Sequence, residues 1–188
     1  MKSAWTHLSH VPLRADASDR AECVNELLAG EKAEVLDVGK GNWVLVELED
    51  GYRGWMDQRQ LRPVTQPWEG KSCCLSSMCS MWTGVSGGWL PAGAVVRKHN
   101  AKWFLGENEV FPAGDNPEFL PIEMADWAKT MLGVPYHWGG RSGWGFDCSG
   151  LVVLAAKLQG IAVPRDASQQ FGFGTANTQA EMAKNDIV

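Results

Sequence analysis

The stretch LGVPYHWGGRSGWGFDCSGLVVLAAKLQGIAVPRDASQQ, residues 132–170, decides the fold of this chain. Within it the glycine-rich loop YHWGGRSGWGFD leads into SGLVVLAAKLQG, whose alanines, leucines and terminal glycine predict a mostly buried helix. We expect that helix to begin at or directly after Cys148. A thiol at a first helical turn lies among unpaired backbone N–H groups, where the helix dipole favours the thiolate. A cysteine that only packs a helix start is the alternative.

A shorter amphipathic helix is predicted upstream of this loop. The apolar residues that recur there at spacings of three and four are Met124, Trp127, Ala128 and Met131. Pro121 suits the first turn of such a helix, and Gly133 ends the run.

The first half of the chain has a different pattern, with short apolar runs broken by turn residues. In NWVLVELED, residues 42–50, apolar and polar positions alternate as in a half-buried strand. A unit of this kind at 8–64 most plausibly closes as a small β-barrel, because closure removes exposed strand edges. Residues 71–112 repeat the pattern more loosely and predict a second barrel. Residues 65–70 have the composition of a linker and residues 113–119 that of a hinge.

The first of these units resembles the bacterial SH3-like module that accompanies cell-wall enzymes. The resemblance rests on VPLRADAS, LLAGE, GYRGW and a final QL, in that order between residues 11 and 61. Its aromatic residues Trp43, Tyr52 and Trp55 are core and rim residues in the plain interpretation. Tyr52 is the best candidate among them for a ligand contact.

Residues 132–170 closely resemble the signature of the NlpC-type cell-wall peptidases, a bacterial branch of the papain-like cysteine peptidases. That signature runs Gly-x-Pro-Tyr-x-Trp-Gly-Gly, then Phe-Asp-Cys-Ser-Gly, a helix, Pro-Arg and a nearby Gln, and each element is present in order. The resemblance implies an α+β fold class, with small SH3-like β-barrels followed by a truncated papain-like α+β catalytic domain. Residues 119–188 would be the N-terminal part of that catalytic domain.

The same resemblance implies a cysteine endopeptidase that hydrolyses peptidoglycan stem peptides, so the expected partner is a murein peptide. The bond implied is that between γ-D-glutamate and a diamino acid, in peptides with a free N-terminal L-alanine. A non-catalytic protein that binds cell-wall peptides is the alternative. Acyl transfer by the same thiol is a further one, since hydrolysis and transfer share the nucleophile.

Carried over position by position, the resemblance makes Cys148 the nucleophile and places the Tyr136 hydroxyl near the oxyanion and substrate. Asp147 and Ser149 match substrate-binding positions, and Trp138 would line the groove. A carboxylate at Asp147 suits a peptide α-ammonium, while capping of the helix is an equally good and compatible reading.

Other positions of the motif have supporting roles. Gly139 and Gly140 would let the loop approach the sheet closely. Arg165 and Asp166 would order the loop after the helix. Many relatives have a serine where this chain has Ala167, which removes one expected substrate contact.

The general base is the missing part of this site. In the family a histidine follows the cysteine, but His7, His10, His99 and His137 all precede Cys148. A papain-like core also needs several strands against its helix, and few residues follow that helix. We therefore expect the chain to be part of a longer protein, inactive by itself. The alternatives are a complete protein that has lost catalysis and, less favoured, His137 as the base.

Composition excludes several classes of function. The net charge of -5, the pI near 5.4 and singly scattered lysines and arginines argue against a nucleic-acid partner. No apolar run is long enough to cross a membrane. The five cysteines include Cys73, Cys74 and Cys79, which lack the further ligands of a metal site, so no metal or cofactor is predicted. Lack of a signal peptide predicts a cytoplasmic protein, or an envelope or periplasmic one if the N-terminus is truncated.

Overall fold

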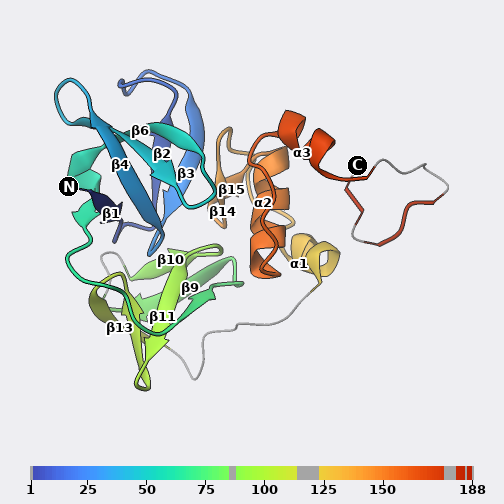
Figure 1. Cartoon of the computed structure of the whole chain (residues 1–188). Coiled ribbons are helices and arrows are strands. Elements are labelled where there is room, and N and C mark those ends of the chain that lie inside the picture. The colour runs from blue at the N-terminus through green and yellow to red at the C-terminus, as the bar shows by residue number, and fades with distance from the viewer. Residues whose placement is uncertain (1, 85–87, 114–122, 176–180, 185, 188) are drawn as a thin grey trace.

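The computed structural model shows two small sheets stacked one above the other, with the helices packed beside them (Figure 1). The residues that the structure describes are 2–84, 88–113, 123–175, 181–184 and 186–187. Pro121 and all of the predicted hinge except Ala113 lie outside them.

The first sheet has seven strands in the order β3-β2-β6-β5-β4-β1-β7. Their bounds are β1 (Ser3–Trp5), β2 (His10–Arg14), β3 (Cys23–Leu28), β4 (Lys32–Val38), β5 (Trp43–Leu48), β6 (Arg53–Asp57) and β7 (Arg62–Pro63), with a 3-10 turn η1 (Gln58–Gln60) before β7. The predicted alternation is confirmed in β5, where Val44, Val46 and Leu48 are buried and the residues between them are half-buried. The sheet also includes β1, which lies before residue 8, the predicted start of this unit. This strand pairs with β4.

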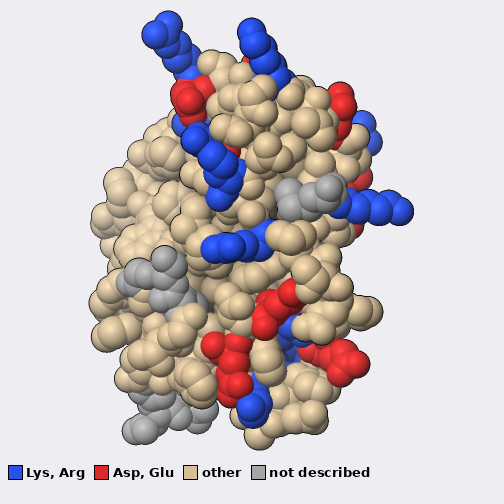
Figure 2. All heavy atoms as spheres, turned by 90° about the vertical axis from the view of Figure 1, so that its left-hand side faces the viewer, with Lys and Arg blue, Asp and Glu red and all other residues tan. Residues whose placement is uncertain are grey.

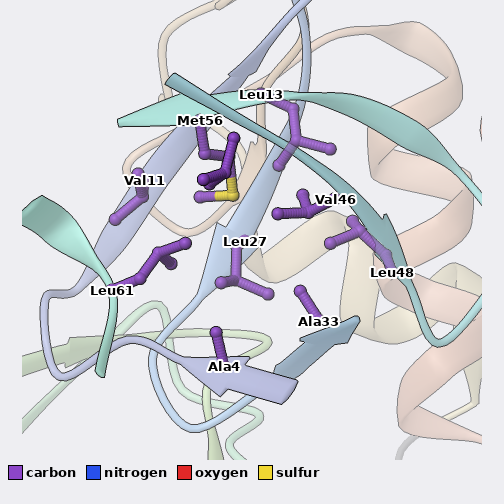
Figure 3. Packing of buried hydrophobic residues seen from close by; sticks show 10 residues of the cluster. Ala4, Val11, Leu13, Leu27, Ala33, Val46, Leu48, Met56 and Leu61 are labelled. Atoms are coloured by element: carbon purple, nitrogen blue, oxygen red, sulfur yellow. The ribbon is translucent and has the colours of Figure 1, made fainter. Parts of the chain in front are cut away.

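An apolar core fills the inside of this curved sheet (Figure 3). Leu13, Leu27, Val46 and Met56 are fully buried there and come from four different strands. Burial of one such side chain contributes about 1.5–3 kcal/mol, so the alternating strands supply most of the driving force for this unit.

The second sheet has six strands in the order β10-β9-β13-β12-β11-β8. Their bounds are β8 (Lys71–Cys74), β9 (Cys79–Thr83), β10 (Trp89–Pro91), β11 (Val95–His99), β12 (Lys102–Leu105) and β13 (Asn108–Pro112). Its core contains Trp82 and also Trp5 and Ala29 from the first sheet. A Cβ on Gly106 would lie 2.3 Å from the Trp5 ring, so the two sheets share a close-packed boundary.

The remaining elements form the third unit, with α1 (Met124–Thr130), a hairpin of β14 (Arg141–Ser142) and β15 (Gly145–Phe146), α2 (Cys148–Leu158) and α3 (Ala167–Phe173). The predicted face of α1 packs on α2, with Trp127, Met131 and Leu154 in one buried cluster. Trp127 Nε1 also donates a hydrogen bond to the Ser76 carbonyl at 2.7 Å, which fixes α1 against the second sheet.

A buried ion cluster joins the three units. Arg141 Nη1 and Nη2 lie 3.0 and 2.6 Å from the two Glu31 carboxylate oxygens, and Lys157 of α2 donates to the same carboxylate. Lys157 Nζ also donates to the Gly93 carbonyl of the second sheet at 2.7 Å. Burial alone would raise the pKa of Glu31, but the charges of Arg141 and Lys157 lower it to about 2. The third unit is therefore anchored to the first sheet by two ion pairs and to the second sheet by a hydrogen bond.

The surface and the cysteines add little to the functional argument. Basic and acidic side chains lie next to one another on the face drawn in Figure 2, without a continuous basic surface there. No described helix is long and apolar enough to cross a membrane. All five cysteines are free thiols, and the described ranges hold no group of three metal-ligating side chains.

Candidate active site

Cys148 is the first residue of α2 and is exposed, so the predicted helix start is confirmed. Asp147 precedes it in an extended conformation as the N-cap, and its Oδ1 accepts a hydrogen bond from Gly150 N at 2.7 Å. The cap fixes the first turn of the helix. The thiol is thereby presented to solvent among the backbone N–H groups of that turn.

The carboxylate of Asp147 is the centre of a buried polar cluster. Arg165 Nη2 lies 2.7 Å from Oδ2 and Nη1 lies 3.0 Å from Oδ1. Gly139 N donates to Oδ2 at 2.9 Å, and the Ser149 hydroxyl donates to Oδ1 at 3.2 Å. Burial would raise the pKa of Asp147, but the Arg165 guanidinium and the Gly150 and Gly139 N–H groups hold it below its usual range. The carboxylate is therefore ionised.

The geometry assigns supporting roles to two residues predicted to touch substrate. A carboxylate has about four acceptor positions, and Asp147 already accepts from five donors. Its capping role is confirmed, whereas a grip on a substrate ammonium stays a prediction with no free acceptor to support it. Ser149 is likewise buried, with its hydroxyl between Asp147 and Arg165.

Arg165 has partners beyond the loop that it is predicted to order. It is buried and reaches back to the start of α2, where it binds Asp147 and also donates from Nε to Asn25 Oδ1 of the first sheet at 3.2 Å. Nothing in the local sequence indicates these partners. Gln170 of α3 secures the same region by donating to the Ser149 and Pro164 carbonyls.

Tyr136 and Trp138 lie on the loop before Cys148 and are 64% and 61% exposed. Desolvation and the neighbouring Cys148 thiolate, with a smaller effect of Asp147, raise the pKa of the Tyr136 phenol. Trp138 Nε1 donates to Glu22 Oε1 at 2.7 Å, which brings in a first-sheet carboxylate that the sequence reading did not select.

Tyr52 reaches the same region from the first sheet. Its hydroxyl donates to Asp166 Oδ1 at 3.3 Å, and burial together with the Asp166 charge raises the pKa of Tyr52 to about 12. The Glu22 charge also acts on the Tyr52 phenol, so Glu22, Tyr52 and Asp166 form one group, which we call the barrel-side rim. The sequence predicts only Tyr52 among them as a ligand contact, because the three residues lie far apart in the chain.

The two glycines of the loop allow the predicted close approach. Gly139 has φ +78°, and a Cβ there would lie 2.3 Å from the Cys23 carbonyl oxygen. A Cβ on Gly140 would lie 2.5 Å from the Gly145 carbonyl oxygen. The loop is therefore pressed against both the first sheet and its own hairpin, which fixes the segment that carries Tyr136 and Trp138.

None of the four histidines contacts the thiol within the described ranges. His10 Nε2 lies 3.8 Å from Glu26, His99 Nε2 lies 3.4 Å from Glu69, and His7 accepts from Arg62 at 3.5 Å. His137 makes its backbone hydrogen bonds to Phe146 and Gly140 in the loop. The described residues thus present an exposed thiol, the predicted nucleophile, without a histidine hydrogen bond to it.

Two family models match separate parts of the chain. Residues 133–188 match the NlpC/P60 family. The C-terminal part of this chain is therefore similar to NlpC/P60 proteins. Residues 13–61 match the bacterial dipeptidyl-peptidase SH3 domain, and this matched segment contains Glu22 and Tyr52, two of the three residues of the barrel-side rim.

Individual relatives agree with this assignment. A Bacillus cereus protein named gamma-D-glutamyl-L-lysine dipeptidyl-peptidase is 31% identical over 98% of this chain and 65% of its own length. A Bacillus subtilis protein of the same name is 27% identical over 87% of this chain and 62% of its own length. The chain therefore spans slightly less than two thirds of each relative.

A solved structure supports the fold. The crystal structure of an NlpC/P60 family protein from Bacillus cereus superposes with a TM-score of 0.77 at 19% identity, over 97% of this chain and 80% of that one. The expected α+β class, with an SH3-like sheet before an NlpC-type part, is confirmed, while an SH3-like identity for the second sheet stays a prediction.

Proposed function

We propose that this protein is a cysteine peptidase that hydrolyses the bond between γ-D-glutamate and a diamino acid in peptidoglycan stem peptides. The observation that carries the proposal is an exposed Cys148 at the start of α2, held by the buried pair of Asp147 and Arg165. The names of the two Bacillus relatives support the choice of bond.

The chemistry follows from the position of the thiol. The Cys148 thiolate attacks the γ-carbonyl carbon, and the amine of the diamino acid leaves as the thioester forms. Water then attacks the thioester and releases the γ-carboxylate together with the thiol. Backbone N–H groups at the start of α2 and the Tyr136 hydroxyl are the available donors for the oxyanion.

The barrel-side rim suits a peptide with a free N-terminus. Glu22 and Asp166 place two carboxylates beside Tyr52 and Trp138, a short distance along the surface from the thiol. Their negative charge favours an α-ammonium, and the SH3 domain closes the site on that side. Short peptides with a free L-alanine amine would thus be selected over acylated ones.

Catalysis also needs a base, which the described contacts of Cys148 do not include. We infer that residues 1–188 alone turn over slowly or not at all, since deprotonation by a histidine typically contributes a factor of about 10² to 10⁴. The same observation favours a second candidate function, binding of a murein peptide without cleavage.

A cleavage assay on L-alanyl-γ-D-glutamyl-L-lysine, read by mass spectrometry, tests the proposal. Release of the dipeptide L-alanyl-γ-D-glutamate is expected, with added imidazole increasing the rate if a base is missing. Cys148→Ala should abolish release, while Cys79→Ala, a half-buried thiol in the second sheet, should leave it unchanged. Peptide binding with equal affinity in both variants, and no dipeptide under any condition, would instead establish the binding protein.

A further inference from the structure

A pocket of about 570 Å³ lies where the first sheet, the second sheet and the C-terminal end of α2 meet. Its wall includes Lys32, Trp68, Lys71, Arg97 and Lys157. The pocket shares no residue with the thiol site, because Cys148 begins α2 and Lys157 lies near its other end. Nine residues of helix separate the two by about 14 Å along the axis.

The charges around this pocket are unbalanced. Two carboxylates, Glu31 and Glu49, line it together with the four basic side chains. Glu31 is not available to Lys32, Lys71 or Arg97, because Arg141 and Lys157 already bind both of its oxygens. No ion pair joins Lys32 or Lys71 to a carboxylate within the described residues. The positive charge facing the pocket therefore exceeds the negative charge.

Arg97 is the most unusual of these cations. It is only 8% exposed, and its two terminal nitrogens donate to the neutral carbonyls of Glu69 and Gly106. Its Nε is buried and has no hydrogen-bond partner among the described residues. Burial lowers the pKa of Arg97 against the opposing charge of Glu107, but the two side chains form no ion pair among the described residues. The Glu107 carboxylate instead accepts hydrogen bonds from Thr65. Buried charges are normally paired, so a buried arginine whose terminal nitrogens bind only neutral carbonyls favours an anion in the pocket that it lines.

Trp68 brings the cations together. Lys32 Nζ lies 4.3 Å and Arg97 Cζ lies 4.8 Å from the centre of its indole ring. Each contact is favourable by itself, but two positive charges on one ring repel each other. An anion in the adjoining pocket would remove that repulsion.

We propose that this pocket binds an oxyanion, the carboxylate or phosphate group of a small ligand, through Arg97, Lys32 and Lys71 beside the indole of Trp68. The site is independent of the thiol and of the peptide bond that is cleaved. Because its walls come from all three units, a bound anion would also stabilise their packing by mass action.

Isothermal titration calorimetry at constant ionic strength tests this, with inorganic phosphate and glutarate as the probes in chloride buffer. Saturable binding of at least one probe is expected. Lys32→Ala and Lys71→Ala should each weaken it about tenfold, the value of one charge-assisted hydrogen bond. Lys40→Ala, an exposed lysine of the same first sheet outside the pocket, should bind like the unmodified protein.

Two results would overturn the proposal. One is the absence of saturable heat with both probes, and the other is binding that neither Lys32→Ala nor Lys71→Ala weakens. Arg97→Met should abolish binding, but because Arg97 is buried its variant can fail to fold, so the two lysine variants decide. Preference for phosphate would indicate a phosphorylated ligand, and preference for glutarate an acidic peptide or dicarboxylate.

Discussion

Arg165 binds Asp147 through both carboxylate oxygens, with Nη2 2.7 Å from Oδ2 and Nη1 3.0 Å from Oδ1, directly below the exposed thiol. The two side chains are almost completely buried. Because Asp147 also caps α2, the pair links the position of Cys148 to a residue that follows the helix. Arg165 is therefore expected to hold the start of α2 in place.

Arg165→Met should lower the free energy of unfolding by about 3–5 kcal/mol, because it leaves the Asp147 carboxylate buried without its partner. Chemical denaturation measures the change. Arg59→Met is the matched control, since Arg59 is exposed and its pair with Asp57 contributes little to stability. Equal losses in the two variants would contradict a supporting role for Arg165.

Iodoacetamide at neutral pH should modify Cys148 first. Cys148 is exposed, whereas burial raises the pKa of the other four thiols, Cys23, Cys73, Cys74 and Cys79, and lowers their thiolate fraction. Intact mass should show one rapid addition, which Cys148→Ala removes. Rapid labelling that persists in Cys148→Ala would show that another thiol is the reactive one.

Glu31→Gln should destabilise the protein by about 3 kcal/mol at pH 7, because Arg141 then lies buried without a carboxylate. The folded pKa of Glu31, about 2, is below its ordinary value of 4.5, so its contribution is present above pH 4.5 and is lost as the pH falls toward 2. Denaturation across this range should show the difference between the two proteins shrinking toward acid. A difference that stays constant would mean that the Glu31 charge is not responsible.

Glu22→Gln should raise KM for L-alanyl-γ-D-glutamyl-L-lysine several-fold and leave kcat nearly unchanged, since the rim carboxylate acts in binding and not on the reacting bond. The N-acetylated peptide supplies the control, because it has no ammonium to lose. An equal rise in KM for the free and acetylated peptides would instead show that Glu22→Gln acts by displacing Trp138, which donates to Glu22.

Gly139→Ala and Gly133→Ala form a matched pair. Both glycines have positive φ, +78° and +94°, but only Gly139 has a neighbour that a Cβ would meet, the Cys23 carbonyl oxygen. Gly133→Ala should cost about 1 kcal/mol, and Gly139→Ala about 1–3 kcal/mol more. Thermal unfolding compares them, and similar melting temperatures would argue against close contact between the loop and the first sheet.

Local patterns in the sequence predicted much of this structure. The alternation in β5, the face of α1 and the start of α2 at Cys148 each follow from residues a few positions apart. The resemblance read from the signature around Cys148 agrees with the NlpC/P60 match to residues 133–188. The local sequence therefore indicated both the secondary structure and this similarity.

The sequence did not reveal contacts between distant segments. The pairs Glu22 with Trp138 and Glu31 with Arg141 join residues more than a hundred positions apart, and no periodicity indicates such partners. For the same reason the sequence predicted the capping role of Asp147 but not its buried partner Arg165, which follows the helix. Such pairings follow only once the sheets and helices are placed in space.

The shared carboxylate of Glu31 has a consequence for dissecting the protein. Its two cationic partners belong to the hairpin and to α2, so removing the first sheet would leave Arg141 and Lys157 as uncompensated charges in the remainder. The segments that match the SH3 and NlpC/P60 models are thus joined by a buried ion cluster, and we expect them to unfold together. Transplanting the piece with Arg141 and Lys157 onto another protein would require a substitute anion at that position, and transplanting the piece with Glu31 would require substitute cations.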